Sequence, residues 1–313
     1  LTLGPNTTGN PRTVTDGGAL ATYASSFGRI NYSFMNRYLL TASLRADGSS
    51  KFEGDERWGY FPSIGAGWVI SDETFMANQN IFDYLKLRGS WGKVGNASVP
   101  ANLAVQIVDQ KAGFTAVIGG QPAPGASITS IVPPIIFWEK GVGTDIGIEG
   151  TLIDKKLNFE IDWYNRKTEQ AIFDIPVIGW LGLAGSSIRG NQADFENTGW
   201  EFTVGWRDDI NKDFNYSLNG NFSINNNKVL SVVTGNNPIF AGGAAATSGQ
   251  LSTRTVAGQP IGQFFGLVVN GIFQTPAEIS GSAQPNASPG DFRYVDTNKD
   301  GVIDAKDRVV IGN

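Results

Sequence analysis

Four segments between Asp145 and Asn225 alternate apolar and polar residues with a strict period of two. Their apolar positions are Ile146, Ile148, Gly150 and Leu152; Leu157, Phe159, Ile161 and Trp163; Trp200, Phe202, Val204 and Trp206; and Phe214, Tyr216, Leu218, Gly220, Phe222 and Ile224. Successive side chains of a strand point to opposite faces, so this period predicts strands with one face in an apolar medium and the other in water. The four segments are expected to form two β-hairpins.

Two architectures produce such strands. In a soluble β-sandwich or jelly roll, the apolar face covers a core. In a transmembrane β-barrel, it faces lipid, and each strand needs about 9–11 residues to cross the membrane. The segments here run for roughly 8–12 residues, about twice the usual length of a strand in a soluble protein. Their length and their aromatic residues favour the barrel.

Composition is compatible with a barrel and excludes several other classes of protein. The 313 residues are 41% hydrophobic with a mean hydropathy of −0.14, as expected when lipid-facing and water-facing residues alternate. There is no run of about 18 apolar residues, so a transmembrane helix is excluded. A net charge of −5 argues against nucleic-acid binding.

The chain has no cysteine and no histidine. Disulfides, thiol nucleophiles, Ser-His-Asp triads and His-ligated metals are therefore excluded, and any enzyme chemistry would depend on carboxylates. We expect no enzymatic activity. The chain begins without a basic and apolar leader, so we expect the export signal of a membrane barrel to lie in a missing N-terminal part.

Further strands are expected at about 24–34, 38–46, 58–70 and 84–94. With the two hairpins they make about eight strands within 24–226, joined alternately by short and long connections. The short connections are 35–37, 71–83 (a short helix or structured turn), 154–156 and 209–213. The long ones are 47–57, 95–137, 169–197 and the excursion 227–313. Outer-membrane barrels have this asymmetry, with short periplasmic turns and long extracellular loops.

Several stretches resemble the SusC/RagA family of TonB-linked outer-membrane transporters. They are Arg29–Tyr32, Tyr38–Arg45, Asp47–Phe52, Trp58–Ser63, Leu85–Ser90, Val94–Asn96, Trp138–Lys140, Asn197–Glu201, Gly258–Gly262 and Asp300–Asp304, in the family's order. The resemblance implies an all-β, antiparallel transmembrane β-barrel, 22-stranded in the family, with an N-terminal plug. This sequence contains no plug and no TonB box, and it resembles the later part of such a barrel.

The resemblance also implies a function and partners. We expect TonB-dependent active import of a bulky nutrient, a glycan or a peptide, across the cell outer membrane. The expected partners are a SusD-like surface lipoprotein and the TonB-ExbB-ExbD complex, which would act through the missing N-terminal part. Two alternatives remain open: a passive or small outer-membrane barrel, and a secreted carbohydrate-binding β-protein with a calcium loop.

The segment 296–307 matches an EF-hand-type calcium loop, with Gly301 at the sixth position for the sharp turn. The candidate ligands are Asp296, Asn298, Asp300, Val302 through its carbonyl, Asp304 and Asp307. Aspartate at the last position is shorter than the usual glutamate, and no flanking helices are evident. Structural Ca²⁺ that orders the excursion is one interpretation, and a solvated series of Asx turns that binds nothing is the other.

Other candidate residues lie on the polar parity of the strands. A carboxylate pair for glycoside hydrolysis could be drawn from Glu149, Glu160, Asp162 and Glu201. We favour a water-filled lumen, lined by these carboxylates and by Arg45, Arg88 and Arg207. Gly65 and Gly67 are expected to leave space on one face of their strand. Five aromatic residues are expected to be exposed: Phe137, Trp138, Trp180, Phe240 and Phe265. They would either stack on a sugar ring or a lid protein, or belong to an aromatic girdle or pack in loops.

Overall fold

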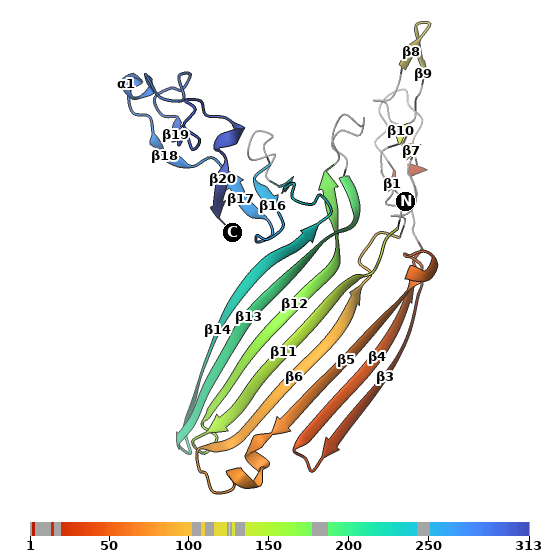
Figure 1. Ribbon diagram of the computed structural model, residues 1–313, viewed down its shortest axis with the longest axis vertical. Helices are drawn as coiled ribbons and strands as arrows, with labels where there is room; N and C mark the ends of the chain where they lie inside the picture. Colours follow the sequence, from red (N-terminus) through yellow and green to blue (C-terminus); the bar gives the residue numbers. More distant parts are fainter. Residues whose placement is uncertain are drawn as a thin grey trace.

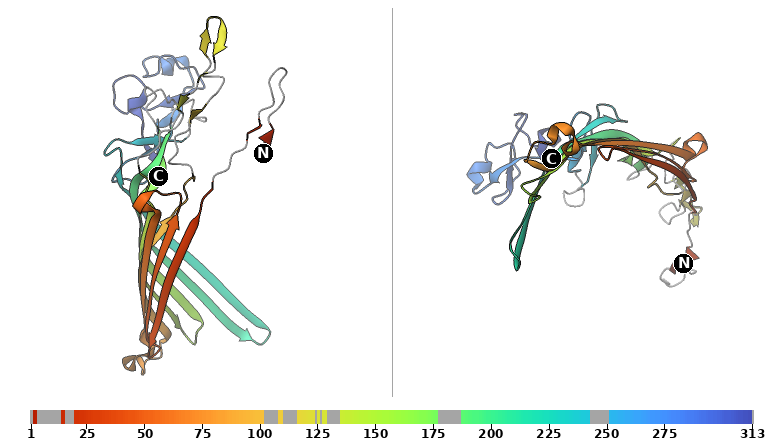
Figure 2. Two further views of the ribbon diagram at one scale, coloured as in Figure 1. Left: turned by 90° about the vertical axis from the view of Figure 1, so that its right-hand side faces the viewer. Right: turned by 90° about the horizontal axis from the view of Figure 1, so that it is seen from below.

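The computed structural model describes residues 2–3, 14–15, 20–101, 108–109, 116–123, 125, 127–128, 135–176, 187–242 and 251–312. Its main feature is one antiparallel sheet of eight strands in the order β14-β13-β12-β11-β6-β5-β4-β3 (Figure 1). The strands are β3 (Tyr23–Phe34), β4 (Tyr38–Ser49), β5 (Trp58–Val69), β6 (Phe82–Asn96), β11 (Glu139–Leu152), β12 (Leu157–Pro176), β13 (Ser187–Asn211) and β14 (Phe214–Val232). The sheet is curved across its strands and is not closed (Figure 2).

The register of the sheet aligns the apolar parities of all eight strands on one face. One continuous row of paired residues is Tyr32, Leu40, Ala66, Gly89, Ile146, Trp163, Trp200 and Ile224. We call this side the apolar face and the opposite side the polar face. Ile146 is 51% exposed, Trp200 46% and Leu218 67%. An exposed apolar surface that continues across eight strands indicates contact with another apolar medium.

Among the described residues, no helix is both long enough and apolar enough to cross a membrane.

Short and long connections lie at opposite ends of the sheet, as the sequence predicts. At one end, residues 35–37, 153–156 and 212–213 form tight turns (Figure 1). Met35 and Asn36 both have positive φ angles there, the left-handed conformation that such turns require. The other end carries η1 (Gly54–Arg57) and the long segments.

The predicted structured turn at 71–83 consists of two 3₁₀ turns, η2 (Ile70–Asp72) and η3 (Thr74–Met76). Glu73 between them accepts hydrogen bonds from Tyr38 Oη at 2.6 Å and Trp68 Nε1 at 3.0 Å, and it pairs with Arg37 at 3.3 Å. These donors, with the Tyr38 hydroxyl as the largest cause, lower the pKa of Glu73 below its ordinary value. The carboxylate thus fastens this turn to the ends of β4 and β5.

Two boundaries expected from the sequence are wrong. The loop expected at 169–197 is instead largely strand, because β12 continues to Pro176 and β13 starts at Ser187. Likewise β14 continues to Val232 rather than ending before residue 227. The reason lies on the apolar face, where the paired row Thr144, Asn165, Thr198 and Asn226 is polar. Above this row the alternation of hydrophobicity stops, whereas the backbone ladder continues.

A buried cluster lies at the long-loop end of the sheet. It consists of Phe52, Phe61, Val99, Ile136 and Trp138. The Trp138 ring lies 4.7 Å from that of Phe52 and 5.5 Å from that of Phe61, and its Nε1 donates to Glu56 O at 3.0 Å. Trp138 is only 5% exposed, so the expectation that its ring is exposed is wrong, and the alternative that it packs among loop residues applies to it.

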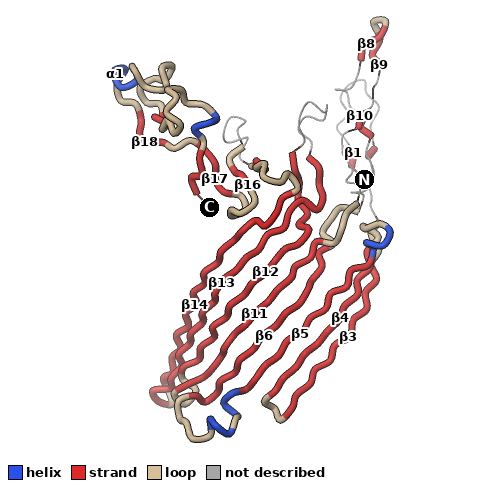
Figure 3. The backbone as a smooth tube through the Cα atoms, viewed as in Figure 1, coloured by secondary structure: helices blue, strands red, loops and turns tan. Residues whose placement is uncertain are grey.

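The remaining described elements are short (Figure 3). Residues 227–313, expected as one irregular excursion, contain a four-stranded sheet in the order β15-β16-β17-β20 and a separate β18-β19 pair. The elements outside the main sheet are β1 (Thr2–Leu3), β2 (Val14–Thr15), β7 (Val108–Asp109), β8 (Ala116–Ile118), β9 (Gln121–Ala123), β10 (Ser127–Ile128), β15 (Ile239–Ala241), β16 (Thr253–Thr255), β17 (Gln263–Gly266), β18 (Val269–Ile272), α1 (Pro276–Ile279), β19 (Phe292–Tyr294), η6 (Ala305–Asp307) and β20 (Val309–Gly312).

The excursion is joined by hydrogen bonds to the end of β14. The Val229 amide donates to Gln259 O and the Gly258 amide donates to Val229 O, both at 2.8 Å. The Ile261 amide donates to Asn227 Oδ1 at 2.8 Å. The segment Gly258–Gly262, part of the family resemblance, therefore holds the small sheet against the main one.

Candidate functional site on the polar face

A cluster of charged side chains centred on Arg88 occupies the middle of the polar face. Arg88 comes from β6 and reaches acids on β11 and β12. Its Nη2 contacts Asp162 Oδ1 at 2.7 Å and also pairs with Glu160, and its Nη1 lies 3.5 Å from Asp145 Oδ1. Its Nε lies 3.5 Å from Glu149 Oε2, but it makes no hydrogen bond.

Lys86 completes the cluster by pairing with Glu149 at 3.0 Å. Four carboxylates thus face two cations, which leaves an excess of negative charge on this part of the polar face. Arg88 loses its side-chain conformational entropy only once, although it contacts several carboxylates. We therefore expect the cluster to be well ordered.

Gly147 is what permits Arg88 to span two strands. In the register, Gly147 of β11 lies directly between Arg88 and Asp162. A Cβ at this position would overlap Asp162 Oδ1 and lie 3.1 Å from Arg88 Nε. The missing side chain opens a path across β11, through which the guanidinium reaches the acids of β12.

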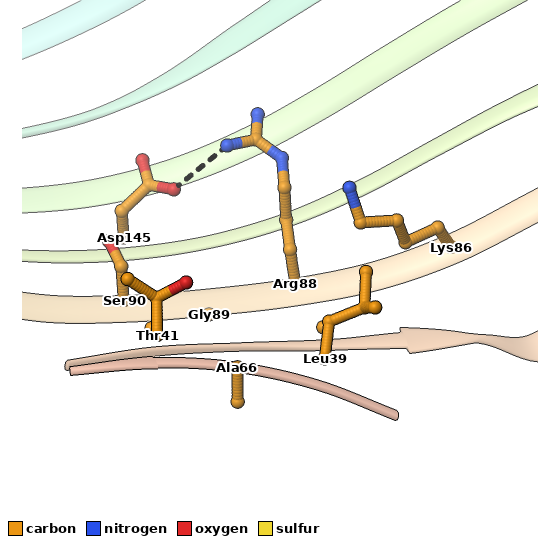
Figure 4. A pocket seen from close by; sticks show the side chains of 10 residues that line it. Leu39, Thr41, Ala66, Lys86, Arg88, Gly89, Ser90 and Asp145 are labelled. Atoms are coloured by element: carbon orange, nitrogen blue, oxygen red, sulfur yellow. Dashed lines mark hydrogen bonds and ion pairs between the residues drawn. The ribbon is translucent and has the colours of Figure 1, made fainter. Parts of the chain in front are cut away.

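A depression of about 250 Å³ adjoins the cluster (Figure 4). Gly65 and Gly67 of β5 line it, which confirms the expected space on that face. Its other walls are Leu39 and Thr41 of β4, with Lys86, Arg88, Gly89, Ser90 and Asp145. Gly65 and Gly67 have no side chains, whereas the residues around them do, so the surface is lower at the two glycines. The charged cluster forms one polar wall of this depression.

The other predicted polar residues also lie on the polar face. Glu201 is paired in register with Asp162. Arg45 pairs with Asp47 at 2.6 Å on β4. Arg207 lies near the turn end, where its amide donates to Lys156 O at 2.8 Å. Glu160 and Asp162 both contact Arg88, an arrangement that lines a polar wall; we therefore keep the lumen interpretation over hydrolysis.

The acidic segment 296–307 folds into a compact loop. The Asp296 carboxylate accepts the Gly301 amide at 2.8 Å and the Asp300 amide at 3.2 Å. Asn298 Oδ1 accepts the Asp300 amide at 2.9 Å, and Asp300 Oδ1 accepts the Val302 amide at 3.0 Å. Gly301 has a φ of +84°, as the sharp turn requires.

The two last candidate ligands are engaged with the backbone. Asp304 caps η6 by accepting the Lys306 amide at 2.7 Å. Asp307 is fully buried and accepts the amides of Asp304 at 2.9 Å and Thr297 at 2.8 Å. These amides, Asp304 first, hold the pKa of Asp307 below its ordinary value of 3.8. Within the described residues, no group of three or more acidic side chains is placed to hold a metal ion.

The remaining predicted aromatic residues are half-buried rather than exposed, except Trp180, which lies outside the described residues. Phe240 and Phe265 pack on each other with ring centroids 5.5 Å apart. Arg254 and Arg308 lie over the Phe265 ring at 5.1 and 4.9 Å. These rings therefore pack inside the excursion, and Phe137 is held by a hydrogen bond from its amide to Asn191 Oδ1.

Sequence reasoning missed Gly147, Lys86 and Asp145 as members of the charged cluster. Lys86 and Asp145 stand on the polar parity of their strands, so their place on the face was readable. Gly147 was not, because its role depends on the register that puts it between Arg88 and Asp162.

The structure resembles known transporters. The RagAB peptide transporter superposes with a TM-score of 0.74 at 23% sequence identity, covering 93% of this chain and 30% of that one. Curated relatives include TonB-dependent receptor P3 of Formosa agariphila, 31% identical over 92% of this chain and 29% of its own length. SusC of Bacteroides thetaiotaomicron is 28% identical over 92% of this chain and 28% of its own length.

This chain spans less than a third of the length of these relatives. The sequence model described as "TonB dependent receptor-like, beta-barrel" matches residues 2–302, which is nearly the whole chain. The eight-stranded open sheet agrees with a part of such a barrel wall. The resemblance to SusC and RagA is confirmed, and the chain belongs to the TonB-dependent receptor-like β-barrel family.

Proposed function

We propose that this chain forms part of the wall of an outer-membrane barrel that imports a bulky nutrient, a glycan or a peptide, with energy from the TonB-ExbB-ExbD complex. The apolar face contacts lipid, and the polar face lines the interior. The observation that carries the proposal is the register, which gives all eight strands one shared apolar face and one shared polar face. Membership of the family supplies the link to TonB.

A SusD-like surface lipoprotein is the proposed partner at the long-loop end. Support comes from the similarity to SusC and to the RagAB peptide transporter. The small sheet β15-β16-β17-β20 of the excursion lies beyond the long-loop end of the main strands (Figure 1), where it would offer a surface outside the membrane. The similarity to the RagAB peptide transporter supports a peptide as one candidate cargo, and a glycan is the other.

The test uses the intact gene product, tagged and extracted gently from outer membranes. We expect a co-purifying lipoprotein, and we expect deletion of TonB to abolish uptake of the nutrient that supports growth through this protein. Uptake that persists without TonB would instead indicate a passive barrel. A chain that appears in the soluble secreted fraction would indicate the carbohydrate-binding alternative.

We also propose that the loop 296–307 binds Ca²⁺ weakly and orders the excursion. The support is the spacing of oxygen-bearing residues at positions 1, 3, 5, 9 and 12, with the glycine at position 6. Extracellular sites of this type have dissociation constants on the order of 10⁻⁴–10⁻³ M. On binding, Asp296, Asn298 and Asp300 would exchange their present hydrogen bonds for the cation.

Metal content of the purified intact protein, measured with and without added Ca²⁺, tests this second proposal. The variant Asp296→Ala with Asp300→Ala should lose the bound Ca²⁺. Glu278→Ala, an exposed acid in the same excursion, serves as the control and should retain it. Equal Ca²⁺ content in the unmodified protein, the double variant and the Glu278 variant would mean that the loop is a solvated series of Asx turns that binds no Ca²⁺.

A further inference from the structure

A group of lysines lies on the apolar side of the main sheet, at its long-loop end. Lys93 of β6, Val142 of β11 and Lys167 of β12 follow one another in a single paired row, and Lys140 of β11 stands two residues beyond Val142. We call Lys93, Lys140 and Lys167 the basic patch. All three have the parity of the apolar positions of their strands, so they share the side of the sheet that contacts lipid in the proposed barrel wall.

The side chains on this side change in a fixed order toward the basic patch. One row contains Trp163 and Trp200, and the next row toward the long loops contains the neutral polar residues Thr144, Asn165 and Thr198. The row after that contains the first lysines. A membrane leaflet has the same order, from hydrocarbon through an interfacial zone that favours tryptophan to charged headgroups. The basic patch therefore stands at the level of the headgroups.

The ammonium groups of the basic patch have no carboxylate partner in the described part of the chain. The lysines that form ion pairs there are Lys86, Lys156 and Lys306. Lys93 instead lies over the ring of Trp91, with its Nζ 6.0 Å from the ring centroid. The charges of the patch are therefore left to solvent or to an external anion.

Two glutamates stand in the same rows as the lysines. In the register, Glu169 faces Lys140 and Glu196 faces Lys167, and Lys228 of β14 follows next to Glu196. Four lysines thus stand against two glutamates in these rows. This local excess of positive charge contrasts with the net charge of −5 of the whole chain.

The acids of β13 near the basic patch are engaged by neutral donors. Glu196 Oε2 accepts a hydrogen bond from Asn165 Nδ2 at 3.4 Å. Asp194, the next acid of the same parity, accepts the Gln170 amide at 2.7 Å and the Ser231 hydroxyl at 2.9 Å. These carboxylates therefore do not neutralise the lysines beside them.

The turn end of the same side is built differently. Leu157, Trp206 and Leu218 form an apolar row there. The first charged residue of this parity beyond that row on β13 is Asp208, which is paired with Lys156 at 2.8 Å. An outer membrane is asymmetric in the same sense, because its phosphorylated glycolipid occupies only the outer leaflet.

The spacing of the basic patch suits one phosphate group. Lys140 is the diagonal neighbour of both Lys93 and Lys167, about 7–8 Å from each, and those two stand two strands or about 9–10 Å apart. Each ammonium group is carried on a flexible four-carbon stem, so the three can converge on one anion. The stems can lie along the apolar surface around Val142 while the ammonium groups reach the headgroup layer.

We infer that the basic patch binds the phosphate group of an outer-leaflet glycolipid, whose acyl chains lie against the apolar face. The inference goes beyond import and its cargo, and it rests on the proposed contact of the apolar face with lipid. A lipid held in this way fixes the long-loop end of β6, β11 and β12 at the level of the headgroups.

Lipid retention by the purified intact protein tests the inference. The protein is reconstituted in phosphatidylcholine nanodiscs that contain either lipid A or dephosphorylated lipid A, and the lipid retained after mild extraction is counted by native mass spectrometry. We expect lipid A to be retained and its dephosphorylated form to be lost. Lys140→Gln combined with Lys167→Gln should reduce retention of lipid A about tenfold. Lys140→Arg combined with Lys167→Arg should preserve it, since the charges remain.

Lys155→Gln combined with Lys212→Gln is the matched control, because it removes the same charge from exposed lysines of the tight turns. It should leave retention within about twofold of the unmodified protein. Equal retention of the two forms of lipid A, or equal effects of the two glutamine variants, would overturn the inference. Displacement of lipid A by an equal concentration of inorganic phosphate would also overturn it, since the patch would then take a free anion.

Insertion into the nanodiscs is measured in parallel and separates this inference from the proposed barrel wall. If the unmodified protein does not insert, both are contradicted. If it inserts but retains no lipid A, only the lipid site is lost. If the Lys140 and Lys167 glutamine variant alone fails to insert, the two lysines are structural and the lipid site is likewise overturned.

Discussion

The lower part of β12 and β13, from the tight turns to Trp163 and Trp200, and the upper part, from Asn165 and Thr198 to the long-loop end, belong to one hydrogen-bonded ladder. The two parts differ in the side chains that they place on the apolar face of the sheet. In the lower part, Phe159, Ile161 and Trp163 face Val204, Phe202 and Trp200. In the upper part, Asn165 and Lys167 face Thr198 and Glu196. Pairing continues in both parts, but in the upper part the register shifts after Thr168, and the amides of Gln170 and Ile172 donate to the carboxylates of Asp194 and Glu139. The surrounding medium sets the difference in side chains: the lower part requires an apolar surface, and the upper part requires a wettable one.

Two buried clusters lie at the long-loop end of the sheet, one around Trp138 and one formed by Ala193, Val229, Val232 and Ile239. The first prediction concerns Trp138. Trp138→Ala in the intact protein should lower the free energy of unfolding by about 3–5 kcal/mol, since it leaves a cavity between Phe52 and Phe61. Urea titration of the protein refolded in lipid vesicles measures this. Phe264→Ala is the control, because Phe264 is 53% exposed and should matter little. Equal effects of the two substitutions would mean that packing of Trp138 does not stabilise this end of the sheet.

Trp163→Arg places a charge on the apolar face of the lower part. It should cost about 2–4 kcal/mol if this face lies in the bilayer, by the same titration. Asn165→Arg, at the next outward position of β12, should cost less than about 1 kcal/mol because it stands on the polar row. Normal membrane assembly and unchanged stability of the Trp163 variant would contradict a lipid-facing surface.

Gly147→Ala tests whether the polar face of the lower part depends on the path across β11. The added methyl group has to displace Asp162 or Arg88, so we expect a loss of about 1–3 kcal/mol. Gly143→Ala is the control on the same strand and the same face, where nothing lies within 4 Å of an added Cβ. If both variants are equally stable, the guanidinium does not need this opening.

Asp307 in the excursion should make the loop 296–307 sensitive to acid. Its pKa in the folded loop is lower than in the unfolded chain, so its contribution is present above about pH 4 and is lost as pH falls through the lowered value. Hydrogen exchange of the Asp304 and Thr297 amides, corrected for intrinsic pH dependence, should accelerate in that range. Asp307→Asn should show fast exchange already at pH 7, and Asp291→Asn should not.

Much of this fold was readable from the sequence because the lower part obeys one rule. The alternation around Trp163 and Trp200 identified strands, faces and turns correctly, and Gly65 and Gly67 marked the depression. The rule fails just above Asn165, because residues 166–170 are polar on both faces and strand cannot be told from loop there. The Arg88 cluster was only half readable: parity placed its members on one face, but the register that joins β6 to β12 through Gly147 is a tertiary property. The burial of Trp138 likewise depends on distant segments meeting.

Single-cysteine scanning of residues 196–206 in the intact protein tests the central claim most directly. Residues 1–313 contain no cysteine, and any cysteine elsewhere in the intact protein is first replaced by serine. Each variant is exposed in membranes to a water-soluble thiol reagent, and a fluorescent label at each site is quenched by nitroxide lipid. The account predicts that positions 200, 202, 204 and 206 are quenched by lipid and protected from the reagent, that odd positions show the reverse, and that lipid quenching disappears at 196 and 198. Uniform access of the reagent from 196 to 206, without lipid quenching, would contradict it.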